Sequence, residues 1–195
     1  LAPVGIYFRK QISHTVNQWF PKMKERPLLP LDEQALAAFN LYPSPDEELR
    51  AACSKEASEA NGEEVGHELI LLRGNQPLYS RMLEIPHDIA LANNGSMAVC
   101  HWDSQGNFQG EAWVLDSDGA TVIREKLNGS PQKCRISPEG TWCAFEIRDT
   151  SNHLALLVYD VRNGNRYSLN PPNGWDNFAF EPKAPVLLLN LQQAV

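Results

Sequence analysis

The sequence lacks the motifs on which several common chemistries depend. Its four cysteines are scattered and form no Cys-x-x-Cys pair, which argues against a disulfide framework and against a zinc ribbon. It contains no Gly-x-Ser-x-Gly, no His-Glu-x-x-His and no Gly-rich phosphate loop. No apolar run reaches the roughly 18 residues of a transmembrane helix. The sequence therefore predicts no membrane span, no metal site, no cofactor and no catalytic residue, and it favours a non-catalytic role.

Positive charge is also in short supply. The chain of 195 residues holds 17 Lys and Arg against 24 Asp and Glu, for a net charge of −7. Proteins that bind nucleic acids or anionic membranes need a cationic field. Neither partner is therefore expected.

The cysteines bear on the compartment. Cys100, Cys134 and Cys143 lie in apolar, strand-like runs, where a reduced thiol behaves as a small hydrophobic side chain. Buried reduced thiols favour a cytoplasmic location. The sequence begins with Leu-Ala-Pro rather than Met, which favours a processed product or a piece of a longer chain.

The first 65 residues have a mixed, partly helical pattern, and we expect an appendage that ends in an acidic linker. Val4–Phe8 is compatible with a short strand, and Leu31–Phe39 is rich in Leu and Ala. Ser44, Pro45 and Glu47 form the pattern of a helix N-cap, a first-turn proline and a capping-box acid. This pattern predicts a helix from about residue 45 to residue 60.

Residues 66–195 have a different pattern, with short β-rich runs separated by turn dipeptides such as Asn94-Gly95. Ile136–Trp142 lies 45 residues after the similar segment Leu91–Met97, and Phe180–Val186 follows 44 residues later. A four-stranded unit that recurs every 43 to 45 residues is typical of a propeller blade. We therefore predict a mainly β fold of antiparallel, four-stranded propeller-blade repeats, with a small α-helical N-terminal segment.

One of these repeats resembles a known family. The segment Ile136–Phe145 reads Ser-Pro-Glu-Gly before an apolar strand that ends in Ala-Phe, and Leu156–Arg166 follows with an Asp and an Asn-Gly turn. Together they resemble the TolB-like β-propeller repeat, which also occurs in the propellers of prolyl-oligopeptidase-like hydrolases. The resemblance covers about residues 66–191 and is weaker in the blade before this one. It implies a fold rather than an activity.

The strand count leaves the propeller incomplete. With strands labelled A to D from the axis outward, the runs read C-D, A-B-C-D, A-B-C-D and A-B, about three blades' worth. A closed propeller ring needs at least four blades, and the unpaired edge of a sheet can pair with a strand of another chain. Either the chain is part of a larger propeller, or its ends pair with another copy or with a companion chain, or the N-terminal segment covers the exposed edges. Two copies that exchanged their complementary half-blades would close a six-bladed ring.

One rim of the propeller carries the candidate binding residues. The D-to-A and B-to-C connections of all blades emerge on the same face, and they carry aromatic, basic and acidic side chains of the kind that protein interfaces use. The candidates are His87, Trp102, Asp103, Lys133, Arg148, Asp149 and Trp175. For Trp102 and Trp175, packing between blades is an equally good interpretation, whereas Trp113 and Trp142 are expected in the core.

These observations lead to three functional hypotheses. The first is a non-catalytic protein-interaction or assembly module, which binds a partner or itself. The second is the accessory propeller region of a larger serine hydrolase whose catalytic domain lies outside this chain. The third is a propeller that binds a small ligand.

Overall fold

The computed structural model describes residues 29–60, 63–102, 109–170, 175–181 and 186–191. The strand expected at Val4–Phe8 and the candidate Asp103 lie outside these residues. Within them the chain forms one short helix and fifteen strands. In order these are α2 (Glu33–Leu36), β1 (Phe39–Pro43), β2 (Leu49–Ser54), β3 (Ser58–Ala60), β4 (Glu63–Arg73), β5 (Gln76–Leu83), β6 (Pro86–Leu91), β7 (Met97–Trp102), β8 (Gly110–Leu115), β9 (Thr121–Leu127), β10 (Ser130–Ile136), β11 (Trp142–Arg148), β12 (Leu154–Asp160), β13 (Asn165–Leu169), β14 (Trp175–Phe180) and β15 (Leu187–Leu191).

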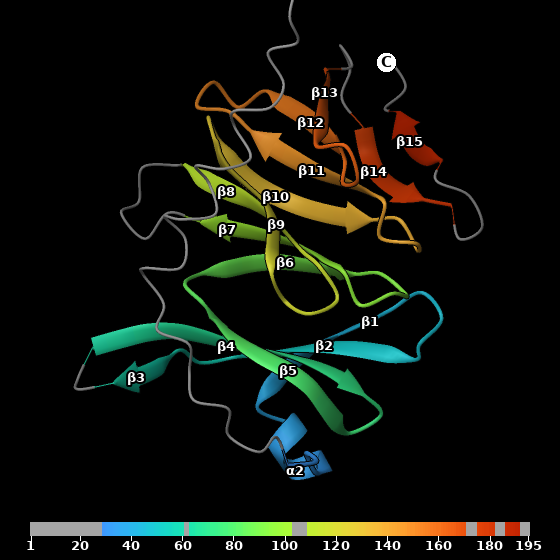
Figure 1. Cartoon of the computed structure of the whole chain (residues 1–195). Coiled ribbons are helices and arrows are strands. Elements are labelled where there is room, and N and C mark those ends of the chain that lie inside the picture. The colour runs from blue at the N-terminus through green and yellow to red at the C-terminus, as the bar shows by residue number, and fades with distance from the viewer. Residues whose placement is uncertain (1–28, 61–62, 103–108, 171–174, 182–185, 192–195) are drawn as a thin grey trace, which may run out of the picture.

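The strands form a row of antiparallel sheets, as predicted. Three sheets have four strands in simple succession: β1-β2-β4-β5, β6-β7-β8-β9 and β10-β11-β12-β13. A fourth has two, β14-β15, and the short strand β3 pairs with the start of β4. Figure 1 shows the sheets following one another from α2 at one end of the molecule to β14 and β15 at the other. We call them blades 1 to 3 and the half-blade.

Neighbouring blades are joined at the turns between their first two strands. Asn93 accepts a hydrogen bond from the Asp46 N–H through its side chain, and its own N–H donates to the Pro138 carbonyl. The Asn94 amide donates to the Glu139 carbonyl at 3.0 Å. Gly140 (φ 71°) makes this contact possible, since a Cβ there would lie 2.6 Å from the Asn94 side-chain oxygen. The first turns of blades 1, 2 and 3 are thus hydrogen-bonded one to the next, which accounts for their even spacing along the chain.

The core consists of apolar layers between successive blades. The layer between blades 2 and 3 contains Cys100, Cys134 and Cys143 together with Phe145. All four cysteines are buried free thiols. Burial raises the pKa of each of Cys53, Cys134 and Cys143, so these thiols stay protonated and pack as small apolar groups.

The predicted helix over residues 45–60 is wrong. Ser44 Oγ accepts the Leu49 N–H, and Asp46 accepts both the Ser44 hydroxyl and the Glu48 N–H, so the expected capping residues form a tight turn between β1 and β2. Glu47 in this turn has φ 61°. Residues 39–54 are the two inner strands of blade 1, which continues into β4 and β5 beyond residue 65.

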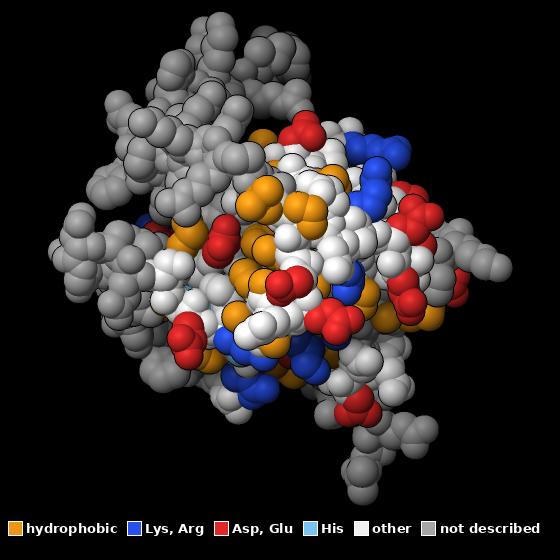
Figure 2. Space-filling model, turned by 90° about the horizontal axis from the view of Figure 1, so that it is seen from below, with side chains coloured by type: hydrophobic (Ala, Val, Ile, Leu, Met, Phe, Trp, Pro, Cys, Tyr) orange, Lys and Arg blue, Asp and Glu red, His pale blue; other side chains and the backbone are white. Residues whose placement is uncertain are grey.

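The helix expected at Leu31–Phe39 is present but short, and it closes the N-terminal end of the row. Leu36 is buried against Ala52, Ile70 and Leu72 on the outer face of blade 1, and Leu31 and Phe39 pack there as well. Figure 2, which views the molecule from this end, shows hydrophobic side chains interspersed with charged and polar ones.

The two ends of the row are therefore not complementary half-blades. The predicted exchange required an N-terminal half-blade without inner strands, but β1 and β2 fill those positions in the same chain. In the described part of the chain, only the half-blade lacks strands C and D.

Candidate functional site

Of the predicted rim residues, two lie in direct contact. His87 stacks on Trp102, with ring centroids 4.3 Å apart and an angle of 21° between the planes. The Trp102 indole N–H donates to the Pro131 carbonyl at 3.0 Å, which links the end of β7 to β10 of the next blade. Trp102 remains 42% exposed. This pair is an aromatic surface that is held in place by a hydrogen bond.

The other rim residues do not converge on it. Arg148 donates to Asn152, and Asp149 accepts the N–H groups of Ser151 and His153, so both organise the loop between β11 and β12. Lys133 is exposed on β10. The rim thus carries separate polar loops rather than one cluster.

Trp175 is placed differently from the rest, because it is buried between blade 3 and the half-blade. It is 3% exposed, and its indole N–H donates to Glu146 Oε2 at 2.6 Å. Glu146 is itself buried. Of the two interpretations of Trp175, the geometry favours packing.

An exposed apolar groove lies at the C-terminal end of the row. This groove of about 350 Å³ runs between the outer strands of blade 3 and the half-blade. Tyr167 and Leu169 on β13, which line this groove, are 49% and 40% exposed. We call this surface the open end; the groove in it is lined by Trp142, Val158, Tyr167, Leu169, Phe180 and Leu187. Trp142, which was expected in the core, is only partly buried there.

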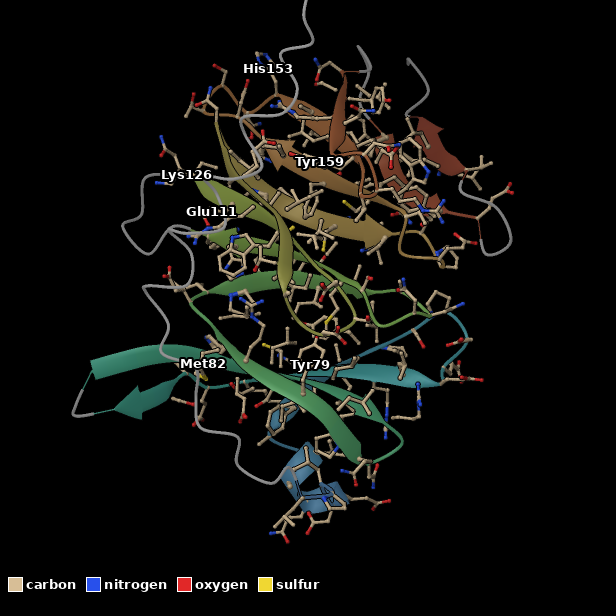
Figure 3. The ribbon with its side chains drawn as sticks, in the orientation of Figure 1. Tyr79, Met82, Glu111, Lys126, His153 and Tyr159 are labelled. Carbon is tan, nitrogen blue, oxygen red and sulfur yellow. The ribbon has the colours of Figure 1, made fainter. Side chains whose placement is uncertain are left out.

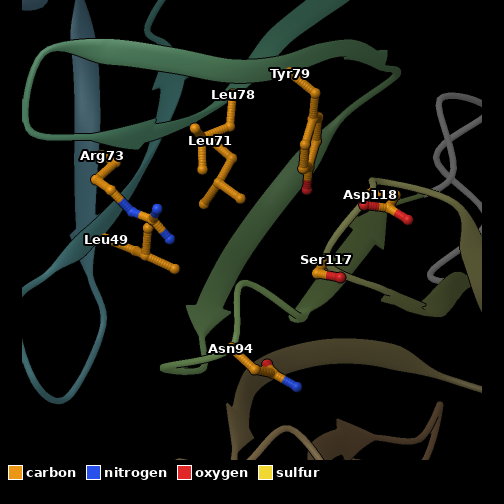
Figure 4. Close-up of a pocket in the computed structure, with 8 residues that line it drawn as sticks. All are labelled: Leu49, Leu71, Arg73, Leu78, Tyr79, Asn94, Ser117 and Asp118. Atoms are coloured by element: carbon orange, nitrogen blue, oxygen red, sulfur yellow. The ribbon is translucent and has the colours of Figure 1, made fainter.

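A second pocket, of about 360 Å³, lies between blades 1 and 2 on the turn side (Figure 4). Leu49, Leu71 and Leu78 supply its apolar lining, with Arg73 on one side and Asp118 on the other. An apolar lining flanked by opposite charges is compatible with a small zwitterionic or amphipathic molecule.

Blades 1 and 2 also share a cationic and aromatic cluster around the buried side chains of Trp113 and His101. The guanidinium carbons of Arg81 and Arg124 lie 5.4 and 4.6 Å from the centre of the Trp113 ring. Glu111 accepts the Trp113 indole N–H and the Arg124 Nε–H, each at 2.7 Å, and His101 packs against the same indole at 4.2 Å. Burial raises the pKa of Glu111, but the hydrogen bonds from Arg124 and Trp113 outweigh it and hold that pKa below its usual value.

His101 in this cluster gives the fold a sensitivity to acid. Burial lowers the pKa of His101 to about 3; Glu111 opposes the shift, and Arg81 and Arg124 reinforce it. In the unfolded chain the pKa is near 6.5, so below that pH the unfolded state binds a proton that the folded state does not. The contribution of His101 to stability is therefore complete above pH 6.5 and falls by at most about 1.4 kcal/mol per pH unit as the pH drops towards 3.

We expect urea unfolding at pH 7, 6 and 5 to show this loss in the natural chain. The variant His101→Phe keeps a ring against Trp113 but cannot titrate, so its stability should fall less steeply over the same range. Equal slopes for the two proteins would contradict the role assigned to His101.

Within the described segments, no group of three or more His, Cys, Asp or Glu side chains could hold a metal ion. The same segments contain no helix of the length and hydrophobicity needed to cross a membrane.

Comparison with known proteins supports the architecture. The chain is similar to a solved structure of hydrazine synthase from Kuenenia stuttgartiensis, with a TM-score of 0.54 and 12% identity over 77% of this chain and 49% of that one. It is less similar to a putative TolB from Agrobacterium tumefaciens (TM-score 0.46, 16% identity, 70% of this chain and 48% of that one). The chain thus spans about half the length of these proteins. At 12% identity the likeness to hydrazine synthase concerns the fold alone. No protein-family model and no curated protein matches the sequence.

Sequence reasoning missed the open end and the cluster around Trp113. The runs Tyr167–Leu169 and Val186–Leu188 are apolar in the sequence, but apolar strands are normally buried. Their exposure depends on which strands lie beside them, which the sequence of the runs does not state. The cluster joins residues far apart in the chain, and only the pairing of the blades brings them together.

Proposed function

We propose that this chain is a non-catalytic protein-interaction or assembly module, built on a partial propeller of the TolB-like repeat class, and that its contact surface is the open end. The repeat residues at Ile136–Phe145 support the repeat class. The buried free thiols are compatible with a cytoplasmic setting.

The exposed groove, beside a strand that has no partner on its outer edge among the described strands, is the observation that carries the proposal. At the opposite end of the row, α2 and its flanking residues bury the corresponding sheet face. At the open end, Tyr167 and Leu169 face solvent, and among the described strands β15 pairs with β14 alone. Contiguous exposed apolar surface and unpaired backbone groups mark contact sites for other polypeptides.

The test is the solution mass of the purified chain. We expect reversible, concentration-dependent association above the monomer mass of 21.9 kDa, and this association should persist at high salt because apolar contacts are not screened. The double variant Tyr167→Lys, Leu169→Lys should remain monomeric. Val122→Lys, at a similarly exposed position (48%) on the outer strand of blade 2, should associate like the natural chain. A natural chain that is monomeric at every concentration would contradict self-assembly.

The pocket beside Arg73 and Asp118 supports small-ligand binding as a second candidate function. Its side chains come from two different blades, so a ligand bound there would contact both. Loss of ligand-induced thermal stabilisation in Arg73→Ala, for any carboxylate found to bind, would place the ligand there.

A further inference from the structure

The boundaries between blades 1 and 2 and between blades 2 and 3 share one packing scheme, from which the contact absent at the open end can be deduced. In blades 2 and 3, strand C places two large apolar side chains, two residues apart, against the blade before it. In blade 2 these are Trp113 and Leu115, and in blade 3 they are Leu157 and Tyr159. Tyr159, labelled in Figure 3, packs in the core layer between blades 2 and 3.

One position on strand D of each blade faces the blade that follows. The residue at this position differs between blades, and its chemistry matches the side chains of the following blade that it contacts. The register of strands C and D makes Arg81, Glu125 and Leu169 equivalent. Arg81 lies over the Trp113 ring of blade 2. Glu125 accepts the Tyr159 hydroxyl at 2.9 Å and pairs with Arg166 at 2.7 Å, both from blade 3. Each boundary therefore uses this position to recognise strands C and D of the next blade.

A second position on strand D, two residues before the first, shows which contact blade 3 lacks. Tyr79 and Ile123 are partly buried against the following blade, and Tyr167 is the equivalent residue of blade 3. Tyr167 and Leu169 are both exposed and apolar. The occupant of the groove must therefore offer apolar side chains where the other boundaries use an aromatic–cation contact or an ion pair.

From this scheme we infer that the open end docks an antiparallel β-hairpin of a partner polypeptide, which adds to the edge of β15 as strands C and D of the half-blade. The first strand of that hairpin carries two large apolar residues, two positions apart, which fill the groove over Val158 and Tyr167. The second strand places an apolar residue against Leu169. This inference rests on one part of the proposed function, namely that the open end binds another polypeptide.

A second copy of the chain cannot complete the half-blade through β15–β15 pairing, so self-association at the open end uses the apolar groove without pairing of that edge. Antiparallel pairing of β15 with β15 of another molecule, about a twofold axis normal to the sheet, puts both third blades on the same side of the shared sheet. Because blade 3 is four strands wide and the half-blade only two, the two third blades would overlap. A free hairpin has no such obstacle.

The probe is a synthetic peptide with the sequence of residues 154–169 of this chain, closed at its open end by an added disulfide because isolated hairpins are marginally stable. It presents Leu157 and Tyr159 in the required spacing. We expect it to bind the full chain, to slow hydrogen exchange of residues 187–190 and to dissolve any self-association. Leu169→Arg should weaken peptide binding by about tenfold or more, since it places a charge in the apolar contact.

Two controls make the result specific. Val122→Arg, at an equally exposed apolar position of blade 2, should bind the peptide like the natural chain, and a peptide with Leu157 and Tyr159 both replaced by Ser should not bind. If the chain self-associates but the peptide neither binds nor slows exchange at β15, the hairpin inference is overturned and assembly stands. If the chain is monomeric but binds the peptide at this edge, the hairpin inference stands and self-assembly is overturned.

Discussion

Replacing Phe145 by Ala should lower the free energy of unfolding by about 3–5 kcal/mol, the range found for removal of a large buried aromatic side chain. Phe145 is fully buried on β11 in the layer between blades 2 and 3. Its ring lies edge-on to Tyr159, with centroids 5.8 Å apart and an angle of 86° between the planes. The cavity would thus open at the centre of the row, where two blades share one core. Urea unfolding followed by circular dichroism measures the loss.

Two variants calibrate this measurement. Phe145→Leu keeps most of the apolar volume and should cost less than about 1.5 kcal/mol. Tyr167→Ala removes an exposed ring from the open end and should change the stability by about 0.5 kcal/mol or less in the isolated chain. A loss below about 1 kcal/mol for Phe145→Ala would show that the layer between blades 2 and 3 is not the common core described above.

The repeat was predictable from the sequence because each blade restates the same turn. Gly95 and Gly140 both take positive φ at the first hairpin of their blades, and the strands that follow them are apolar. The spacing of such turns depends only on local residues, so it can be read from the sequence. The antiparallel, four-stranded order of the repeats followed from it, and the sheets confirm this order. The strand count fell short by β1 and β2, the inner strands of blade 1.

The inner strands of blade 1 were not predictable in the same way. Ala51, Ala52 and Cys53 are buried on both faces of the sheet, so the alternation that normally marks a strand is absent. Alanine also has the highest helix propensity, and the Ser44-Pro45 pattern is shared by helix caps and by tight turns. Tertiary pairing with β4 decides between the two, and that pairing is not visible in the local pattern.

The rim was the part of the candidate site that the sequence described least well. The topology placed the loops on one face of the molecule. The side chains in these loops either form local hydrogen bonds, as Asp149 does, or are buried, as Trp175 is. Glu146 has no special signal in the sequence. Its role follows from its position in blade 3, where the register makes it equivalent to Cys100 of blade 2, and from the indole that reaches it.

A second large loss of stability is expected when the indole of Trp175 is removed. Trp175→Ala should destabilise the half-blade by about 3–5 kcal/mol, because it removes a buried aromatic ring. It also leaves the Glu146 carboxyl group buried without its donor. Trp175→Phe keeps part of the ring packing and loses the N–H together with some apolar volume, so it should cost about 1–3 kcal/mol. Hydrogen exchange of β14 and β15 should rise in both variants, while β6 to β9 stay protected.

A double-mutant cycle separates the hydrogen bond from the packing. Glu146→Leu in the natural background removes the acceptor and leaves the indole N–H buried, whereas Glu146→Leu combined with Trp175→Phe leaves neither group unsatisfied. The double variant should therefore be more stable than the sum of the single losses predicts, by about 1 kcal/mol or more. Additive losses would mean that Trp175 contributes only apolar contact, and that the half-blade is held to blade 3 without the buried hydrogen bond.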